Sequence, residues 1–118
     1  MADAVDNPVV RLTLELSLQV MEFVEELEKQ RRFILAQQVL RSATSIGASV
    51  REAQHAESRA DFIHKCKIAA KEAEETDYWL LLCEKAPNYP SPPPQVLDTQ
   101  QQVRHLLARI ILTSKANG

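Results

Sequence analysis

Glu52 and His55 have the spacing in this chain that best fits metal chemistry. A Glu-x-x-His pair places both side chains on one face of a helix, and di-iron bundles use two such pairs with two further glutamates. The sequence of 118 residues contains no second Glu-x-x-His. A metal-dependent bundle enzyme around Glu52 and His55 is therefore kept as a third alternative. The ordinary interpretation is that Glu52 and His55 are simply polar residues at the end of a helix.

Cys66 and Cys83, with the three histidines, are the other candidates for chemistry. The cysteines lack Cys-x-x-Cys spacing, and the histidines share no ligand spacing with them or with each other. Both cysteines fall on an apolar helical stripe, where a cysteine usually acts as a small apolar side chain. Only Gly47 and Gly118 are glycines, so no glycine-rich phosphate loop can form. We predict no enzymatic activity, no cofactor and no metal.

Length and charge indicate one domain, residues 1–118, with a formal net charge of -2. This charge gives no general attraction to nucleic acid or to anionic membranes. No apolar stretch reaches the roughly 18 residues of a membrane span. The acidic N-terminus lacks the charged start and apolar run of a signal peptide. We therefore expect a cytoplasmic protein with reduced cysteines and no membrane partner.

Apolar periodicity predicts four helices, at about residues 8–28, 33–55, 59–86 and 95–113, with a Pro-rich linker at 87–94. From Val10 to Val20 the pattern also alternates as in a strand. That alternation is too long for a typical strand, and its Leu, Glu and Gln residues favour helix. In the third helix, apolar positions from Phe62 to Cys83 alternate steps of four and three, as in helical bundles. The predicted fold class is all-α.

Local signals mark where helices begin and where they approach each other. Asn7 followed by Pro8 predicts an N-cap and first turn. Ser58 and Asp61 have capping-box spacing. Gly47 in mid-helix, four residues after a small alanine, predicts that a neighbouring helix approaches closely there.

A run of five apolar residues, Trp79-Leu-Leu-Leu-Cys83, predicts self-association. Successive helical side chains are about 100° apart, so the run points all the way round the helix. A helix in a monomeric bundle buries only one stripe, and large exposed apolar patches usually mark an interface. The alternative is that this end of the helix is buried because the Pro-rich linker covers it. The candidate interface residues are Trp79, Leu81, Leu82, Ile111 and Leu112.

Charged residues offer two further hypotheses. A basic face repeated around an oligomer would attract phosphate, although a simple solvated face is the alternative because the whole chain is slightly acidic. We also expect interhelical ion pairs, in particular between Arg41 and a carboxylate of the third helix, which would set helix register. The candidate RNA face is Arg51, Arg59, Lys65, Lys67 and Lys71, and the candidate ion-pair residues are Arg41, Glu52, Glu72 and Glu75.

A set of residues spread over the second and third predicted helices carries a family resemblance: Arg41, Ala43-Thr-Ser-Ile46, Glu52-Ala53, Asp61-Phe62-Ile63, Ala69, Glu72-Ala73, Glu75-Thr76 and Tyr78-Trp79-Leu80. With these residues, the stretch 35–86 resembles the bacterial four-helix-bundle family first noticed in intervening sequences of 23S rRNA genes. Ser49-Val50-Arg51 departs from the Asn-Ile-Ala that the family commonly has there.

This resemblance implies an antiparallel up-down-up-down four-helix bundle that assembles into a homo-oligomeric ring, with a pentamer known in the family. It also implies a similarity to the accessory variability determinant of diversity-generating retroelements, which binds a reverse transcriptase and RNA. Our first interpretation is a non-enzymatic oligomeric scaffold or adaptor, with itself as partner. The second is an RNA-binding accessory protein, and any other protein or RNA partner stays unidentified.

Overall fold

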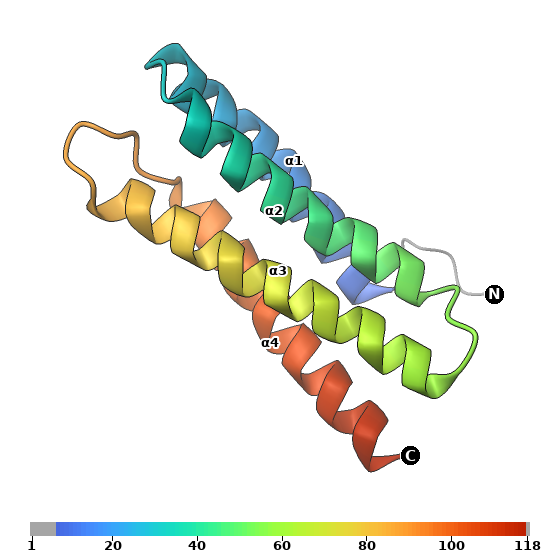
Figure 1. The fold of residues 1–118 in the computed structure, drawn as a ribbon. Helices are drawn as coiled ribbons and strands as arrows, with labels where there is room; N and C mark the ends of the chain where they lie inside the picture. The colour runs from blue at the N-terminus through green and yellow to red at the C-terminus, as the bar shows by residue number, and fades with distance from the viewer. Residues whose placement is uncertain (1–6, 118) are drawn as a thin grey trace.

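Four α-helices form the computed structural model of the chain, which describes residues 7–117. They are α1 (Pro8–Lys29), α2 (Phe33–Ala53), α3 (Arg59–Lys85) and α4 (Pro94–Ala116), and this range contains no strand. The predicted all-α fold with four helices is confirmed. Figure 1 shows the helices lying lengthwise along one another. The expectation about a signal peptide falls on residues 1–6, outside the described range.

Two helix ends differ from the predicted bounds by more than one residue. α2 ends at Ala53, because the amides of Gln54 and His55 bond to the carbonyls three residues earlier and tighten the chain into a turn. α4 continues to Ala116, and the amide of Asn117 still bonds to the carbonyl oxygen of Thr113 at 3.1 Å. The last turn of α4 therefore adds Lys115 to the helical surface.

The predicted N-caps of α1 and α3 are present. Asn7 Oδ1 accepts a hydrogen bond of 3.2 Å from the amide of Val9, and Ser58 Oγ accepts one of 3.0 Å from the amide of Asp61. The Asp61 carboxylate accepts from the amide of Glu57 at 3.1 Å, one residue before the usual partner in a capping box. These bonds satisfy amides that the helices leave without partners.

The turn between α1 and α2 closes without glycine. Arg31 has a left-handed backbone with φ of 62°, and the amides of Arg31 and Arg32 bond to the carbonyls of Glu28 and Leu27, each at 2.9 Å. The Arg32 guanidinium lies 4.2 Å above the Tyr89 ring and donates to the Asn88 carbonyl oxygen at 3.3 Å. These contacts join the turn to the segment between α3 and α4.

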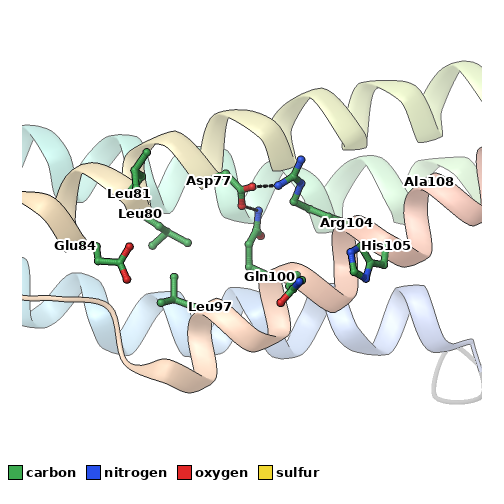
Figure 2. Close-up of a pocket in the computed structure, with 10 residues that line it drawn as sticks. Asp77, Leu80, Leu81, Glu84, Leu97, Gln100, Arg104, His105 and Ala108 are labelled. Carbon is green, nitrogen blue, oxygen red and sulfur yellow. Dashed lines mark hydrogen bonds and ion pairs between the residues drawn. The ribbon is translucent and has the colours of Figure 1, made fainter.

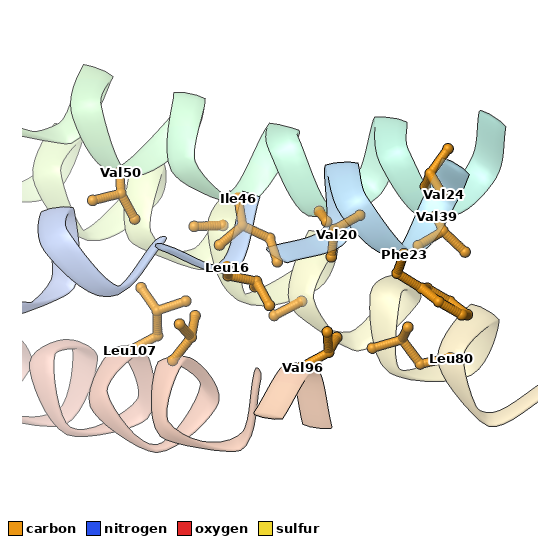
Figure 3. Packing of buried hydrophobic residues seen from close by; sticks show 14 of the residues in the cluster. Leu16, Val20, Phe23, Val24, Val39, Ile46, Val50, Leu80, Val96 and Leu107 are labelled. Atoms are coloured by element: carbon orange, nitrogen blue, oxygen red, sulfur yellow. The ribbon is translucent and has the colours of Figure 1, made fainter. Parts of the chain in front are cut away.

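All four helices contribute to one apolar core. α1 contacts α2 and α4, and α3 contacts the same two helices. Leu16 and Val20 of α1 meet Ile46 of α2, Leu80 of α3 and Val96 of α4 in this core (Figure 3). The apolar side chains recur every three or four residues, so each helix presents one stripe to the others.

None of the helices within residues 7–117 has the length and hydropathy that crossing a membrane would require.

α1 approaches α2 closely at Gly47. A Cβ atom at Gly47 would lie 3.6 Å from Thr13 Cβ and 3.7 Å from Ser17 Oγ, which are ordinary van der Waals distances. The predicted approach is thus present, but it leaves room for a methyl group. The backbone of Gly47 is ordinary helix, so glycine is not required there by either space or conformation.

Candidate functional site

A surface groove between α3 and α4 contains most of the polar contacts that join these helices. One hollow in this groove has a volume of about 520 Å³. Asp77, Leu81 and Glu84 lie at helical spacing along α3, while Leu97, Gln101, His105 and Ala108 follow α4. Figure 2 shows the Leu80 and Leu97 side chains lining one part of the hollow and the Asp77–Arg104 pair bordering another.

Gln100 joins the two helices beneath this groove. Its side chain is 2% exposed, and Nε2 donates to the carbonyl oxygen of Ala73 at 2.8 Å and to Asp77 Oδ1 at 2.7 Å. The other carboxylate oxygen of Asp77 accepts from Arg104, which also donates to Glu74 Oε2 at 2.7 Å. Among the described residues, Gln100 Oε1 is buried without a hydrogen-bond partner. A network that starts from a buried amide favours one alignment of α4 against α3.

The Gln100 network was not predicted, although the sequence contains one signal for it. Gln100 lies on the apolar stripe of α4 between Val96 and Val103, where an uncharged polar side chain interrupts the pattern. A buried amide needs partners, so its position predicts polar groups on the facing helix. Asp77 accepts the bond from Gln100, and Arg104 donates to the same carboxylate. These two residues are 27 positions apart, and nothing in their spacing predicts that they meet.

Arg41 lies beside two carboxylates of α3. One guanidinium nitrogen is 3.7 Å from Glu72 Oε2, and another donates to Glu75 Oε2. Glu75 Oε2 also accepts a bond of 2.9 Å from the indole nitrogen of Trp79. Glu52, the remaining candidate for these pairs, contacts Lys65 Nζ at 3.1 Å instead of Arg41. The Arg41 side chain is half exposed, so solvent weakens its contribution to stability.

The structure divides the candidate basic face. Arg51 lies one turn after Gly47, which faces α1, so Arg51 is on the α1 side of α2 and apart from the lysines of α3. Lys65 is half-buried and paired with Glu52. Arg59 is exposed and donates to the backbone carbonyl of Asn117. The five predicted residues therefore do not form one continuous surface of unpaired positive charges.

Lys67 has a cationic neighbour that the sequence analysis did not pair with it. The ammonium of Lys115, within hydrogen-bond reach on α4, lowers the pKa of Lys67 below its usual value, and Lys71 adds to this effect. All three side chains are exposed. They form a small cationic cluster across the α3–α4 boundary, where the extended end of α4 meets the first half of α3.

The predicted apolar interface residues differ in exposure. Leu81 is 46% exposed and Leu112 is 68% exposed, whereas Trp79, Leu82 and Ile111 are partly buried. The run at 79–83 is thus largely covered within one chain, and Leu81 is its most accessible member. The structure also exposes large apolar side chains that the sequence analysis did not propose as an interface: Leu14, Leu18, Met21, Phe33, Ile34 and Tyr78.

The candidate groups for metal or thiol chemistry do not converge. Glu52 and His55 are exposed at the end of α2, and within residues 7–117 no three His, Cys, Asp or Glu side chains gather in a way that could hold a metal ion. Cys66 and Cys83 are buried and not bonded to each other. Burial raises the pKa of the Cys66 thiol, and it raises the pKa of Cys83 to about 11. Both thiols are therefore protonated at neutral pH.

These features define an all-helical, four-helix protein with exposed apolar and charged side chains along its outer faces. The chain belongs to the 23S rRNA-intervening sequence protein family, whose model matches residues 5–111. A crystal structure of a protein of unknown function from the S23 ribosomal protein family of Bacteroides thetaiotaomicron VPI-5482 is similar to it. That similarity has 40% sequence identity and a TM-score of 0.79, and it covers 87% of this chain and 97% of the other. No curated protein matches the chain.

Proposed function

We propose that the protein is a non-enzymatic scaffold or adaptor that assembles with itself. The observation that carries this proposal is the number of large apolar side chains exposed on the outside of all four helices. They include Leu14 and Leu18 on α1, Ile34 on α2, Leu81 on α3 and Leu112 on α4. A monomer gains nothing from exposing them, whereas an oligomer buries apolar surface at about 25 cal/mol per Å².

The proposed architecture is an antiparallel up-down-up-down bundle in a homo-oligomeric ring, and the family resemblance favours a pentamer. Contacts between helix ends support the antiparallel order. Asn7, at the start of α1, donates to Gln54 Oε1 just beyond α2 at 3.0 Å, and Arg59, at the start of α3, bonds to Asn117 just beyond α4. We also propose a cytoplasmic location.

Light scattering at micromolar concentration tests the assembly. We expect a mass that is a multiple of the 13.3 kDa chain. Replacing Leu81 and Leu112 by Asp should lower that mass, because both side chains are exposed in one chain and would be buried between chains. Ala48→Asp, on the exposed surface of α2 and away from Ile34, is the control that should leave the mass unchanged. A wild-type monomer would contradict the proposal.

RNA binding is the second candidate function, and the cluster of Lys67, Lys71 and Lys115 favours it. Cations held close together relieve their repulsion when they bind phosphate, and a ring would repeat the cluster. The predicted face of Arg51, Arg59, Lys65, Lys67 and Lys71 would act through Lys67, Lys71 and Arg59, since Arg51 lies apart and Lys65 is paired.

A binding titration with single-stranded RNA at several salt concentrations tests this candidate. We expect affinity to fall as salt rises, and to be lost in Lys67→Glu/Lys71→Glu. Lys29→Glu is a control with the same type of change, at a lysine on α1 outside the cluster. Equal loss in the control would mean that net charge alone drives binding. That result, or no binding by the wild type, would reject the proposed RNA face.

A further inference from the structure

α1 carries a second apolar stripe that its own core does not use. Leu14, Leu18 and Met21 are spaced by four and three residues, so they share one face of the helix. They are 48%, 55% and 52% exposed. Leu18 follows the core residue Leu16 by two positions, which is roughly 200° around a helix. The stripe therefore points away from the core.

Acidic side chains surround the α1 stripe. α1 contains five glutamates against Arg11 and Lys29, and three of these glutamates, Glu15, Glu22 and Glu25, line a shallow hollow with Leu18 and Met21. Within residues 7–117, neither Glu22 nor Glu25 has a basic side chain within ion-pair distance. Two such stripes facing each other would bring like charges together, which disfavours a symmetric contact.

The outer surface of α4 has the complementary character. Leu112 is 68% exposed, with Arg109 one turn before it and Lys115 one turn after it. No carboxylate among the described residues lies within ion-pair distance of Arg109 or Lys115. Beside Leu112 is a hollow of about 320 Å³, with a mainly apolar lining that includes Ala70, Ala73, Leu107, Ala108 and Ile111.

We infer that the α1 stripe of one copy docks against the α4 surface around Leu112 of a second copy. This inference rests on the proposed self-association and names the two halves of its contact. Leu18 and its neighbours would fill the hollow beside Leu112, and Glu22 and Glu25 would lie near Arg109 and Lys115. Because the two halves are different surfaces, a docked pair still has one free α1 stripe and one free α4 surface. Such a head-to-tail contact continues until it closes into a ring or extends as a filament.

Crosslinking between two single-cysteine variants tests the contact. Leu18→Cys and Leu112→Cys are purified separately, mixed and treated with a short bismaleimide. We expect the mixture to form a crosslinked pair containing one copy of each variant, while neither variant alone crosslinks above wild type. The native cysteines do not interfere, since Cys66 is 3% exposed and Cys83 is 0% exposed. Gln37→Cys mixed with Leu112→Cys is the matched control and should not crosslink.

The other outcomes separate this contact from self-association in general. Crosslinking of Leu18→Cys with itself would indicate a symmetric contact and overturn the inference. An oligomer without any crosslink would overturn it as well, while leaving self-association intact. A monomeric wild type would overturn both.

Charge reversal supplies a second test that does not depend on cysteine reactivity. Glu22→Lys/Glu25→Lys and Arg109→Glu/Lys115→Glu should each lose assembly alone, since each places like charges across the contact. Combining all four substitutions in one chain should restore it, because opposite charges then face each other at every contact, whatever the number of copies. Failure of the four-substitution variant to assemble, with every variant folded by circular dichroism, would reject the pairing.

Discussion

The side-chain amide of Gln100 on α4 donates a hydrogen bond of 2.7 Å to Asp77 Oδ1 on α3, below the surface of the groove between these helices. The same nitrogen donates to the carbonyl oxygen of Ala73, one turn earlier on α3. Two bonds from one amide fix both the rotation and the axial position of α4. Apolar contacts between α4 and α3 are non-directional, so they specify the position of α4 less sharply than these hydrogen bonds do.

Gln100→Ala should lower the free energy of unfolding by about 1–3 kcal/mol, the usual effect of removing one member of a buried hydrogen-bonded set. Urea denaturation measures this change. Gln102→Ala is the control, because Gln102 is exposed and bonds only to Asp98 of its own helix, at 3.0 Å. Equal losses in the two variants would show that the Gln100 network contributes nothing particular to stability.

Arg41→Gln should destabilise the fold by no more than about 1 kcal/mol, because Arg41 is half exposed and solvent screens its pairs with Glu72 and Glu75. The loss should shrink in high salt. Glu75→Gln should cost more, since Glu75 also accepts a bond from Trp79. Denaturant midpoints of the single and double variants measure the coupling energy. A coupling energy of zero for Arg41 and Glu75 would refute the ion pair.

Gly47→Ala should stabilise the protein by about 0.5–1 kcal/mol, because alanine is the better helix former and its methyl group has space beside Thr13 and Ser17. Gly47→Leu should destabilise it, since the larger side chain would push α1 away from α2. Thermal unfolding of both variants is the measurement. A loss of stability in Gly47→Ala would mean that the helices pack more tightly at this point than these distances indicate.

Stability should fall as pH rises from about 9 to about 11, in part through Cys83. Burial raises the pKa of this thiol from 9.0 to about 11 in the folded chain. The unfolded chain therefore releases the proton first, and folding stability is lost as pH rises through this window. Each unit of pKa difference corresponds to about 1.4 kcal/mol. Cys83→Ala should show a flatter decline in urea titrations across this range, and an unchanged decline would count against the shifted thiol.

The locations of the helices and their caps follow from the sequence alone. Asn7 and Ser58 bond to amides two and three residues away, and the apolar stripes repeat every three or four residues. Such signals act within one or two turns of a helix, so they need no knowledge of neighbouring helices. The family resemblance between residues 35 and 86 could be seen in the same way, because it depends on residue types at fixed spacing.

Only the tertiary structure determined which surfaces are available. Gln100 and Asp77 are 23 residues apart, and Lys67 and Lys115 are 48 apart, so their meeting depends on the rotation and register of α4 against α3. Periodicity gives the apolar stripe of each helix but does not determine how two helices are turned relative to each other. The same packing half-buried Trp79 and left Leu18 and Leu112 exposed, because exposure depends on where neighbouring helices end and how closely they approach.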